Sequence, residues 1–141
     1  MANGVYNKFL AALAAGSIDL TSGTFKMVLC DSATYTADLT DSGDEFLSDI
    51  SGGARLTTGT LTTTFGVLAS RVFDASDFTG TFPDPGGGAT GEILVIYKDT
   101  GVEATSPLLF YYDTITGLPM TLDGTDDTVQ FNASGIWKLG A

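Results

Sequence analysis

The spacing of apolar residues changes from helical to alternating near Gly16. Before that glycine, apolar side chains recur every three or four residues, which predicts one face of a short α-helix. The positions on this face are Val5, Tyr6, Phe9, Leu10 and Leu13. Asn3 is placed to cap this helix, and Gly16 to end it in a left-handed conformation. The simpler interpretation is that the face packs on the protein's own sheet; the alternative is that it docks on a partner protein.

After Gly16 the apolar positions alternate, as in β-strands. "TFKMVLC" (24–30) predicts a strand that is buried mostly on one face. "EFLSDISGG" (45–53) carries three apolar residues that can hold one short helical turn on the core. "TGTLTTTF" (58–65) and "LASRVFDAS" (68–76) are two runs rich in Thr and aromatic residues around a short break, and they predict a hairpin.

The most apolar segments lie in the second half of the chain. "EILVIYK" (92–98) is apolar at almost every position, as expected for a central strand covered on both faces, and "PLLFYYDTI" (107–115) is its expected neighbour. The preceding segment "TGTFPDPGGGATG" (79–91) contains two prolines and a glycine triplet and predicts a loop. Three further short strands are expected at 118–123, 127–133 and 135–140.

About eight strands after a single helix predict a mainly β protein. The expected architecture is an antiparallel β-sandwich or jelly-roll-like barrel with one short N-terminal helix. At 141 residues the chain is expected to form one domain, 1–141, which is large enough to fold on its own core.

Charge and composition then narrow the possible partners. The charged fraction is 16%, below the usual ~25%, and the net charge is −11, so we expect no binding to nucleic acid or to an anionic membrane surface. No apolar run approaches the ~18 residues of a membrane span, and the short run after Lys8 fits a helix better than a signal peptide. Cys30 is the only cysteine, which excludes an internal disulfide, and its apolar neighbours predict a buried rather than reactive thiol.

The residues that usually carry catalysis are scarce. The chain has no His, which excludes a Ser-His-Asp triad and a His-based zinc site. "GGGATG" (86–91) lacks the Lys-Ser/Thr ending of a phosphate-binding loop. The acidic "DSGDE" (41–45) could supply a carboxylate pair for glycoside hydrolysis, although a solvated loop is the better interpretation. We therefore expect a protein that is not an enzyme and needs no cofactor.

A second acidic group and the aromatic residues have two interpretations each. Asp123, Asp126 and Asp127 lie on one predicted turn, where they could bind calcium or simply face solvent; the closing Glu of a calcium loop is missing, which favours solvent. Adjacent Tyr111 and Tyr112 must point to opposite faces of their strand, so one is core and the other exposed or at an interface. For these aromatics and for Trp137, core packing is favoured over partner binding.

Four segments in the same order along the chain resemble a family of small structural proteins of tailed bacteriophages. They are the opening "MANGVYNKFLAALAAGSIDLTSGTFKMVLCDS", the central "EFLSDISG", the "VIYKDTGVEATSPLLFYYD" block and the ending "TVQFNASGIWKL". The 79–91 loop departs from the family's pattern. The resemblance implies a virion component and, within that class, a head decoration (cement) protein on the major capsid protein.

That implied function has specific expectations for partners and location. The protein would be a homo-oligomer, and a trimer is the expected form. It would be in the host cytoplasm before assembly and on the capsid exterior afterwards. Aromatic anchors and loops usually make such contacts, so the expected contact residues lie in the N-terminal segment and in the proline loop. They are Val5, Tyr6, Phe9, Phe82, Pro83, Asp84 and Pro85. If Tyr6 and Phe9 are core, the contact surface lies on other loops.

The alternative function comes from a different class of virion protein. A β-sandwich with exposed aromatic side chains and acidic loops also suits a tail, connector or fibre protein that binds a receptor or carbohydrate.

Overall fold

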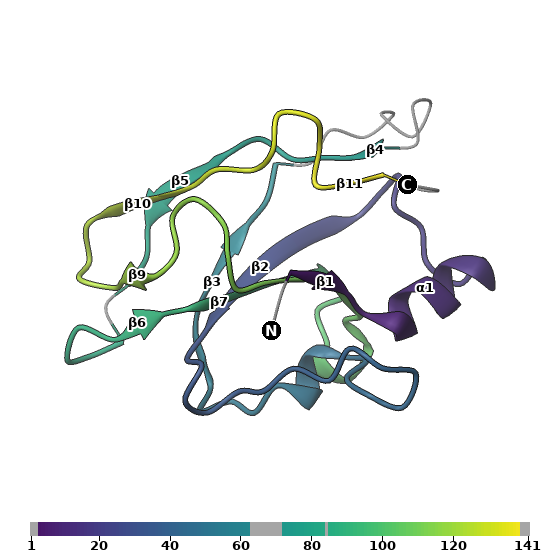
Figure 1. Cartoon of the computed structure of the whole chain (residues 1–141), viewed down its shortest axis with the longest axis horizontal. Helices are drawn as coiled ribbons and strands as arrows, with labels where there is room; N and C mark the ends of the chain where they lie inside the picture. The colour runs from purple at the N-terminus through teal and green to yellow at the C-terminus, as the bar shows by residue number, and fades with distance from the viewer. Residues whose placement is uncertain (1–2, 63–71, 84, 139–141) are drawn as a thin grey trace.

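The computed structural model describes residues 3–62, 72–83 and 85–138, and the fold is mainly β, as predicted (Figure 1). One layer is a five-stranded antiparallel sheet. Its strands, in spatial order, are β1 (Gly4–Val5), β8 (Leu108–Tyr112), β7 (Ile93–Asp99), β2 (Thr24–Cys30) and β3 (Arg55–Thr60).

The remaining strands form short two-stranded ladders. The pairs are β4 (Val72–Phe73) with β11 (Trp137–Lys138), β5 (Phe78–Thr81) with β10 (Asp126–Val129), and β6 (Thr90–Gly91) with β9 (Met120–Thr121). Figure 1 shows β4, β5, β10 and β11 on one side of the five-stranded sheet and the segment 31–54 on its other side. The result is a sandwich-like arrangement in which the second β layer is broken into pieces.

The centre of the large sheet matches the sequence prediction closely. β7 lies between β2 and β8, and its residues 93–97 are all buried because both faces are covered. β2 begins and ends at the predicted residues, but residues 27–30 are all buried, so this half of the strand is covered on both faces and not mostly on one as predicted. Cys30 at its end is buried and has a free thiol. Burial raises the pKa of the Cys30 thiol to about 12, which supports the prediction of an unreactive thiol.

Three phenylalanine rings join the two β layers. The ring centroid of Phe73 in β4 lies 5.0 Å from that of Phe25 in β2 and 5.6 Å from that of Phe110 in β8. Such distances are typical of favourable aromatic pairs, which add to the free energy gained by burying the rings. The short β4–β11 ladder therefore packs on the sheet through the ring of Phe73.

The N-terminal helix is shorter than predicted. α1 spans Asn7–Ala14, and the residue before it, Tyr6, is extended and makes no side-chain cap. The prediction that Asn3 caps the helix is wrong, because Gly4 and Val5 form β1 and pair with Tyr111 and Phe110 of β8. β8 would otherwise be the edge strand of the sheet, with backbone N–H and C=O groups that have no strand partner. The pairing of β1 with β8 supplies these partners, which residues 4 and 5 could not do as part of a helix. The predicted stop is confirmed, since Gly16 has a φ of +71°.

Two other segment predictions need correction. The predicted hairpin of 58–65 and 68–76 includes residues 63–71, which lie outside the described residues; in the described part, β3 pairs with β2 and β4 pairs with β11. The predicted 79–91 loop is shorter at both ends, because residues 79–81 pair with β10 and residues 90–91 pair with β9. The short helical turn predicted at 45–53 is present as a 3₁₀ helix, η1 (Leu47–Asp49). None of the helices in the described part of the chain is long and apolar enough to span a membrane.

A buried hydrogen-bond chain fixes the long 31–46 segment to the core. The hydroxyls of Tyr6 and Tyr35 lie 2.8 Å apart, and the Tyr35 hydroxyl donates to Asp44 Oδ2 at 2.8 Å. Asp44 also accepts a hydrogen bond from the backbone N–H of Asp38 at 3.1 Å. The acidic stretch 41–45, considered above as a source of catalytic carboxylates, thus places Asp44 in a structural network.

Replacing Tyr35 by Phe should therefore destabilise the fold by about 1–3 kcal/mol, because the buried Tyr6 hydroxyl and the Asp44 carboxylate both lose a partner. Urea unfolding of the two proteins measures this difference. Tyr111→Phe is the matched control: Tyr111 is also buried, but among the described residues its hydroxyl makes no hydrogen bond. An equal loss of stability in both variants would contradict a role for the hydrogen-bond chain.

Candidate functional site

Three of the predicted contact residues are core residues. The side chains of Tyr6, Phe9 and Phe82 are at most 1% exposed. Phe9 packs its ring edge-on against Phe110 at 5.4 Å, and Phe82 stacks on Phe78 at 5.0 Å. In this conformation these three aromatics have no exposed surface with which to contact a partner, because their surface is already used inside the fold.

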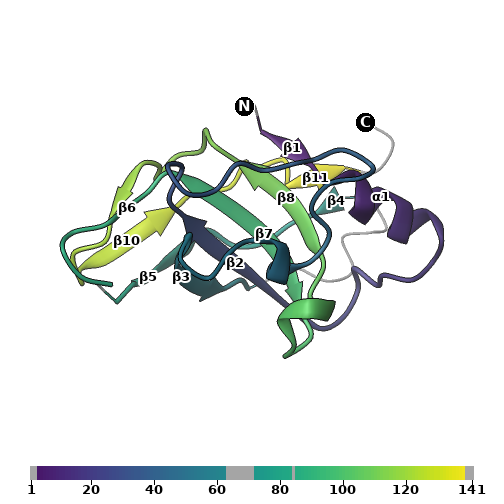
Figure 2. The same cartoon turned by 90° about the horizontal axis from the view of Figure 1, so that it is seen from below.

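The other predicted contact residues have different surroundings. Val5 is half-buried in β1, whereas Pro83 and Pro85 are exposed; Asp84 lies outside the described residues. Figures 1 and 2 place α1 at one end of the long axis of the molecule and the 85–89 loop at the other end. The structure therefore does not bring the two predicted contact segments together into one site.

As expected, one of the two adjacent tyrosines of β8 is buried in the core and the other is partly exposed. Tyr111 is buried on one face of β8, and Tyr112 on the other face is half-buried. Trp137 is half-buried in β11 and closes the core, with its ring 5.5 Å from Phe9 and 5.8 Å from Phe110. The surfaces of Tyr112 and Trp137 that remain uncovered are the relevant ones for binding.

The carboxylates of the acidic turn at Asp123, Asp126 and Asp127 do not converge on one point. Asp123 accepts hydrogen bonds from the Thr125 N–H at 3.0 Å and hydroxyl at 2.6 Å, and Asp126 accepts one from the Thr81 hydroxyl. Burial, followed by the charges of Asp123 and Asp126, raises the pKa of Asp127. Within the described ranges, no group of three or more Cys, Asp or Glu side chains is arranged to hold a metal ion. The arrangement corresponds to a hydrogen-bonded turn between β9 and β10.

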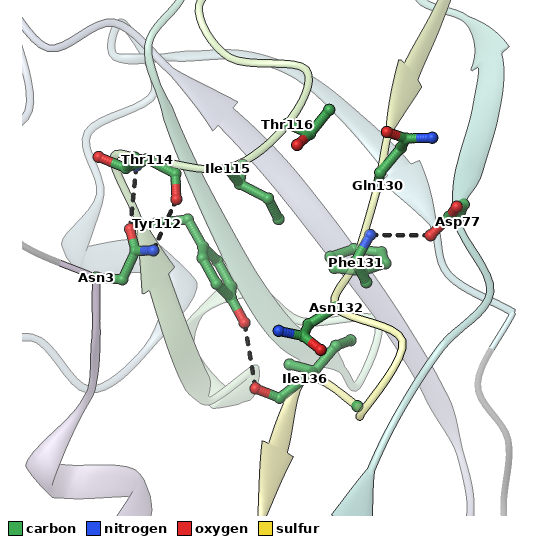
Figure 3. A pocket seen from close by; sticks show the side chains of 11 residues that line it. Asn3, Asp77, Tyr112, Thr114, Ile115, Thr116, Gln130, Phe131, Asn132 and Ile136 are labelled. Carbon is green, nitrogen blue, oxygen red and sulfur yellow. Dashed lines mark hydrogen bonds between the residues drawn. The ribbon is translucent and has the colours of Figure 1, made fainter.

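A pocket of about 580 Å³ opens between the end of β8 and the segment that joins β10 to β11 (Figure 3). One group of lining residues carries amide, hydroxyl or carboxylate side chains: Asn3, Asp77, Thr114, Thr116, Gln130 and Asn132. Another group supplies apolar surface: Tyr112, Ile115, Phe131 and Ile136. The pocket therefore offers hydrogen-bonding groups around a partly apolar wall.

Asn3 fixes one side of this pocket. Its Oδ1 accepts hydrogen bonds from the backbone N–H groups of Asp113 and Thr114, both at 3.0 Å, and its Nδ2 donates to the Thr114 carbonyl at 2.7 Å (Figure 3). These bonds attach the N-terminal strand to the chain that leaves β8. The residue expected to cap a helix instead shapes a pocket.

Hydrogen bonds to backbone groups position the opposite side. Asp77 Oδ1 accepts from the Phe131 N–H at 2.9 Å, and Asn132 Oδ1 accepts from the Ser134 N–H at 2.8 Å. The Tyr112 hydroxyl points to the Ile136 carbonyl at a longer 3.5 Å (Figure 3). Asp77 and Asn132 each keep a second side-chain polar group, a carboxylate oxygen and an amide nitrogen, that makes no hydrogen bond within the described residues.

A smaller apolar slot of about 190 Å³ adjoins the pocket between β1 and β11. It shares Asn3, Tyr112 and Ile136 with the pocket and adds surface from Phe110 and Trp137. The polar pocket and the aromatic slot are therefore adjacent, and we call the two together the β1–β11 groove.

Sequence reasoning missed this groove. Its lining residues come from four separate parts of the chain, around residues 3, 77, 112–116 and 130–137. None of these four segments contains a recognisable binding motif. The only available signal was the prediction that Tyr112 or Trp137 has some exposed surface. Comparison with protein-family models gave no match, and no curated protein matched the sequence.

Proposed function

We propose that this protein is a non-enzymatic decoration (cement) protein of a tailed-phage capsid, which binds the outside of the major capsid protein shell and stabilises it. The observation that carries the proposal is the position of two exposed segments at opposite ends of the long axis (Figures 1 and 2). One end is α1 and the other is the 85–89 loop. A protein that links neighbouring shell subunits needs contact surfaces at separate ends, and the sequence resemblance to phage structural proteins supports the same function.

The contact residues of this proposal are exposed residues at these two ends. On α1 we propose Leu10, which is 39% exposed, as the apolar contact in place of Tyr6 and Phe9. In the loop that follows β5 we propose the exposed Pro83, Pro85 and glycines 86–88 in place of Phe82. An exposed leucine and an exposed loop would each make only a small contact with a capsid subunit. Many such contacts across the capsid lattice would together give strong binding.

Stabilisation would follow from mass action. Copies that bind only the assembled shell favour the assembled state, and a trimer at a local threefold position would contact several subunits at once. The net charge of −11 would keep free copies soluble in the host cytoplasm before assembly.

The first test is the number of copies per virion. We expect a ratio to the major capsid protein near one, with loss of shell stability when the protein is stripped. A ratio of a few copies per hundred would contradict the proposal and favour the tail, connector or fibre alternative.

The second test is rebinding to stripped capsids. Leu10→Glu should weaken rebinding by about tenfold or more, corresponding to ~1.4 kcal/mol or more, because it places a charge on the apolar contact. Val102→Glu is the matched control, since Val102 is 57% exposed but lies in the connection between β7 and β8. Equal rebinding by the wild type and both variants would exclude α1 as a contact.

A further inference from the structure

We propose that the β1–β11 groove binds a neutral saccharide, with its hydroxyl groups in the polar pocket and one face of a sugar ring against the aromatic slot. This inference goes beyond the proposed function, because it requires no contact with a capsid. It is carried by the hydrogen-bonding groups, the charge and the apolar surface of the groove.

The pocket retains unused hydrogen-bonding capacity. Among the described residues, the side-chain amide of Gln130 and the hydroxyl of Thr116 make no hydrogen bond, although both line the pocket. Asn132 uses its Oδ1 but not its amide N–H groups, and Asp77 uses one of its two carboxylate oxygens. These groups include both donors and acceptors, which a sugar requires because each hydroxyl donates and accepts.

The charge of the pocket selects against other polar ligands. Among the described residues that line the pocket, Asp77 is the only acidic side chain and none is Lys or Arg. A phosphate or carboxylate would therefore meet a negative charge without a compensating positive one, on a protein of net charge −11. A neutral hydroxylated ligand avoids this repulsion, and a carboxylate oxygen such as that of Asp77 is a strong acceptor for its hydroxyls.

The slot provides the apolar half of the site. Tyr112, Ile136 and Trp137 contribute surface there, and two of them also line the pocket. Aromatic rings with an apolar face and a polar edge suit the C–H face of a sugar ring. The pocket volume of about 580 Å³ also lies within the range of ~300–1,000 Å³ that is typical of small-molecule sites.

The site is formed before a ligand arrives. The three hydrogen bonds of Asn3 hold β1 against the chain after β8, and Asp77 and Asn132 are held by backbone N–H groups. Little conformational entropy is then lost on binding, which favours measurable affinity for even a small ligand.

Two-dimensional amide NMR of the full chain tests the proposal with glucose, galactose, mannose and N-acetylglucosamine and with a disaccharide of each. At least one of these sugars should shift the signals of Gln130, Asn132 and the Trp137 indole, with a Kd of about 1 mM or tighter. Gln130→Ala should raise that Kd by several-fold or more, whereas Thr58→Ala, at an exposed position of β3, should leave it unchanged.

Three results would overturn the proposal. One is the absence of groove shifts with every sugar at about 50 mM, far above the expected Kd. Another is binding that Gln130→Ala leaves unchanged. The last is a groove whose signals respond to stripped capsids but to no sugar; this result would make the groove a protein contact while leaving the decoration function intact.

Discussion

Raising the pH from about 9 to about 12 is expected to unfold the protein cooperatively. Burial raises the pKa of all five tyrosines: it raises that of Tyr97 and of Tyr112 to about 12, and it raises those of Tyr6, Tyr35 and Tyr111 above their ordinary value near 10. Burial also raises the pKa of Cys30 to about 12. Six acidic protons are therefore held more tightly in the folded state than in the unfolded chain.

The direction of the effect follows from proton linkage. Above about pH 10 the unfolded chain loses tyrosine protons that the folded state retains, so the free energy of unfolding falls as pH rises. The stabilisation is fully present below the unfolded pKa values and is lost through the window from about pH 9, where an unfolded thiol ionises, to about pH 12. Each group contributes up to ~1.4 kcal/mol per pH unit, and a total stability of ~5–15 kcal/mol would be exhausted within a few units.

Two spectroscopic signals check this expectation. The absorbance of tyrosinate and the far-UV circular dichroism should change together in one steep transition during an alkaline titration. Tyr97→Phe removes one of the ionising groups and should shift the transition to higher pH and make it less steep. Gradual ionisation near pH 10 with no change in circular dichroism would contradict the burial of the tyrosines.

Replacing Phe110 by Ala should have the largest effect of a single substitution proposed for this protein. Phe110 is 2% exposed, and its ring lies 5.4 Å from Phe9, 5.6 Å from Phe73 and 5.8 Å from Trp137. It therefore links β8 to α1, β4 and β11. Loss of the ring leaves a cavity where these elements meet, and the expected destabilisation is about 3–5 kcal/mol.

Denaturant unfolding at neutral pH measures this change. Leu10→Ala is the control, because Leu10 is an exposed residue on α1 and its truncation should cost less than about 1 kcal/mol. The Trp137 fluorescence should also change in the Phe110 variant, since the indole loses its neighbour. A destabilisation no larger than that of the control would mean that the surrounding rings close the cavity.

The centre of the fold was predictable because its signal is local. A run such as 93–97 is apolar at every position, and burial on both faces follows from that composition alone. The alternation in 24–30 likewise predicted β2 with its correct bounds. Gly16 predicted the end of α1, because glycine adopts the left-handed backbone conformation that ends a helix with little cost in free energy.

Three of the predicted contact residues, Tyr6, Phe9 and Phe82, are buried in the core for a physical reason. An aromatic side chain suits both a hydrophobic core and a protein interface. The sequence does not show whether the fold itself buries a given aromatic ring or leaves it exposed for a partner. Phe82 illustrates this: its loop contains the exposed Pro83 and Pro85, yet its own ring stacks on Phe78 of β5. Tyr6 is similar, because its hydroxyl bonds to Tyr35, which is far away in sequence.

By itself, the sequence determined the mainly β class, the central strands, the buried thiol and the strongly acidic net charge, all of which depend on composition or on neighbouring residues. Only the tertiary structure decided that Asn3 joins β1 to the end of β8, that β4 pairs with β11, and that a polar groove lies beside Tyr112. These features arise from contacts between residues that are distant along the chain, and such contacts leave no periodic signal in the sequence.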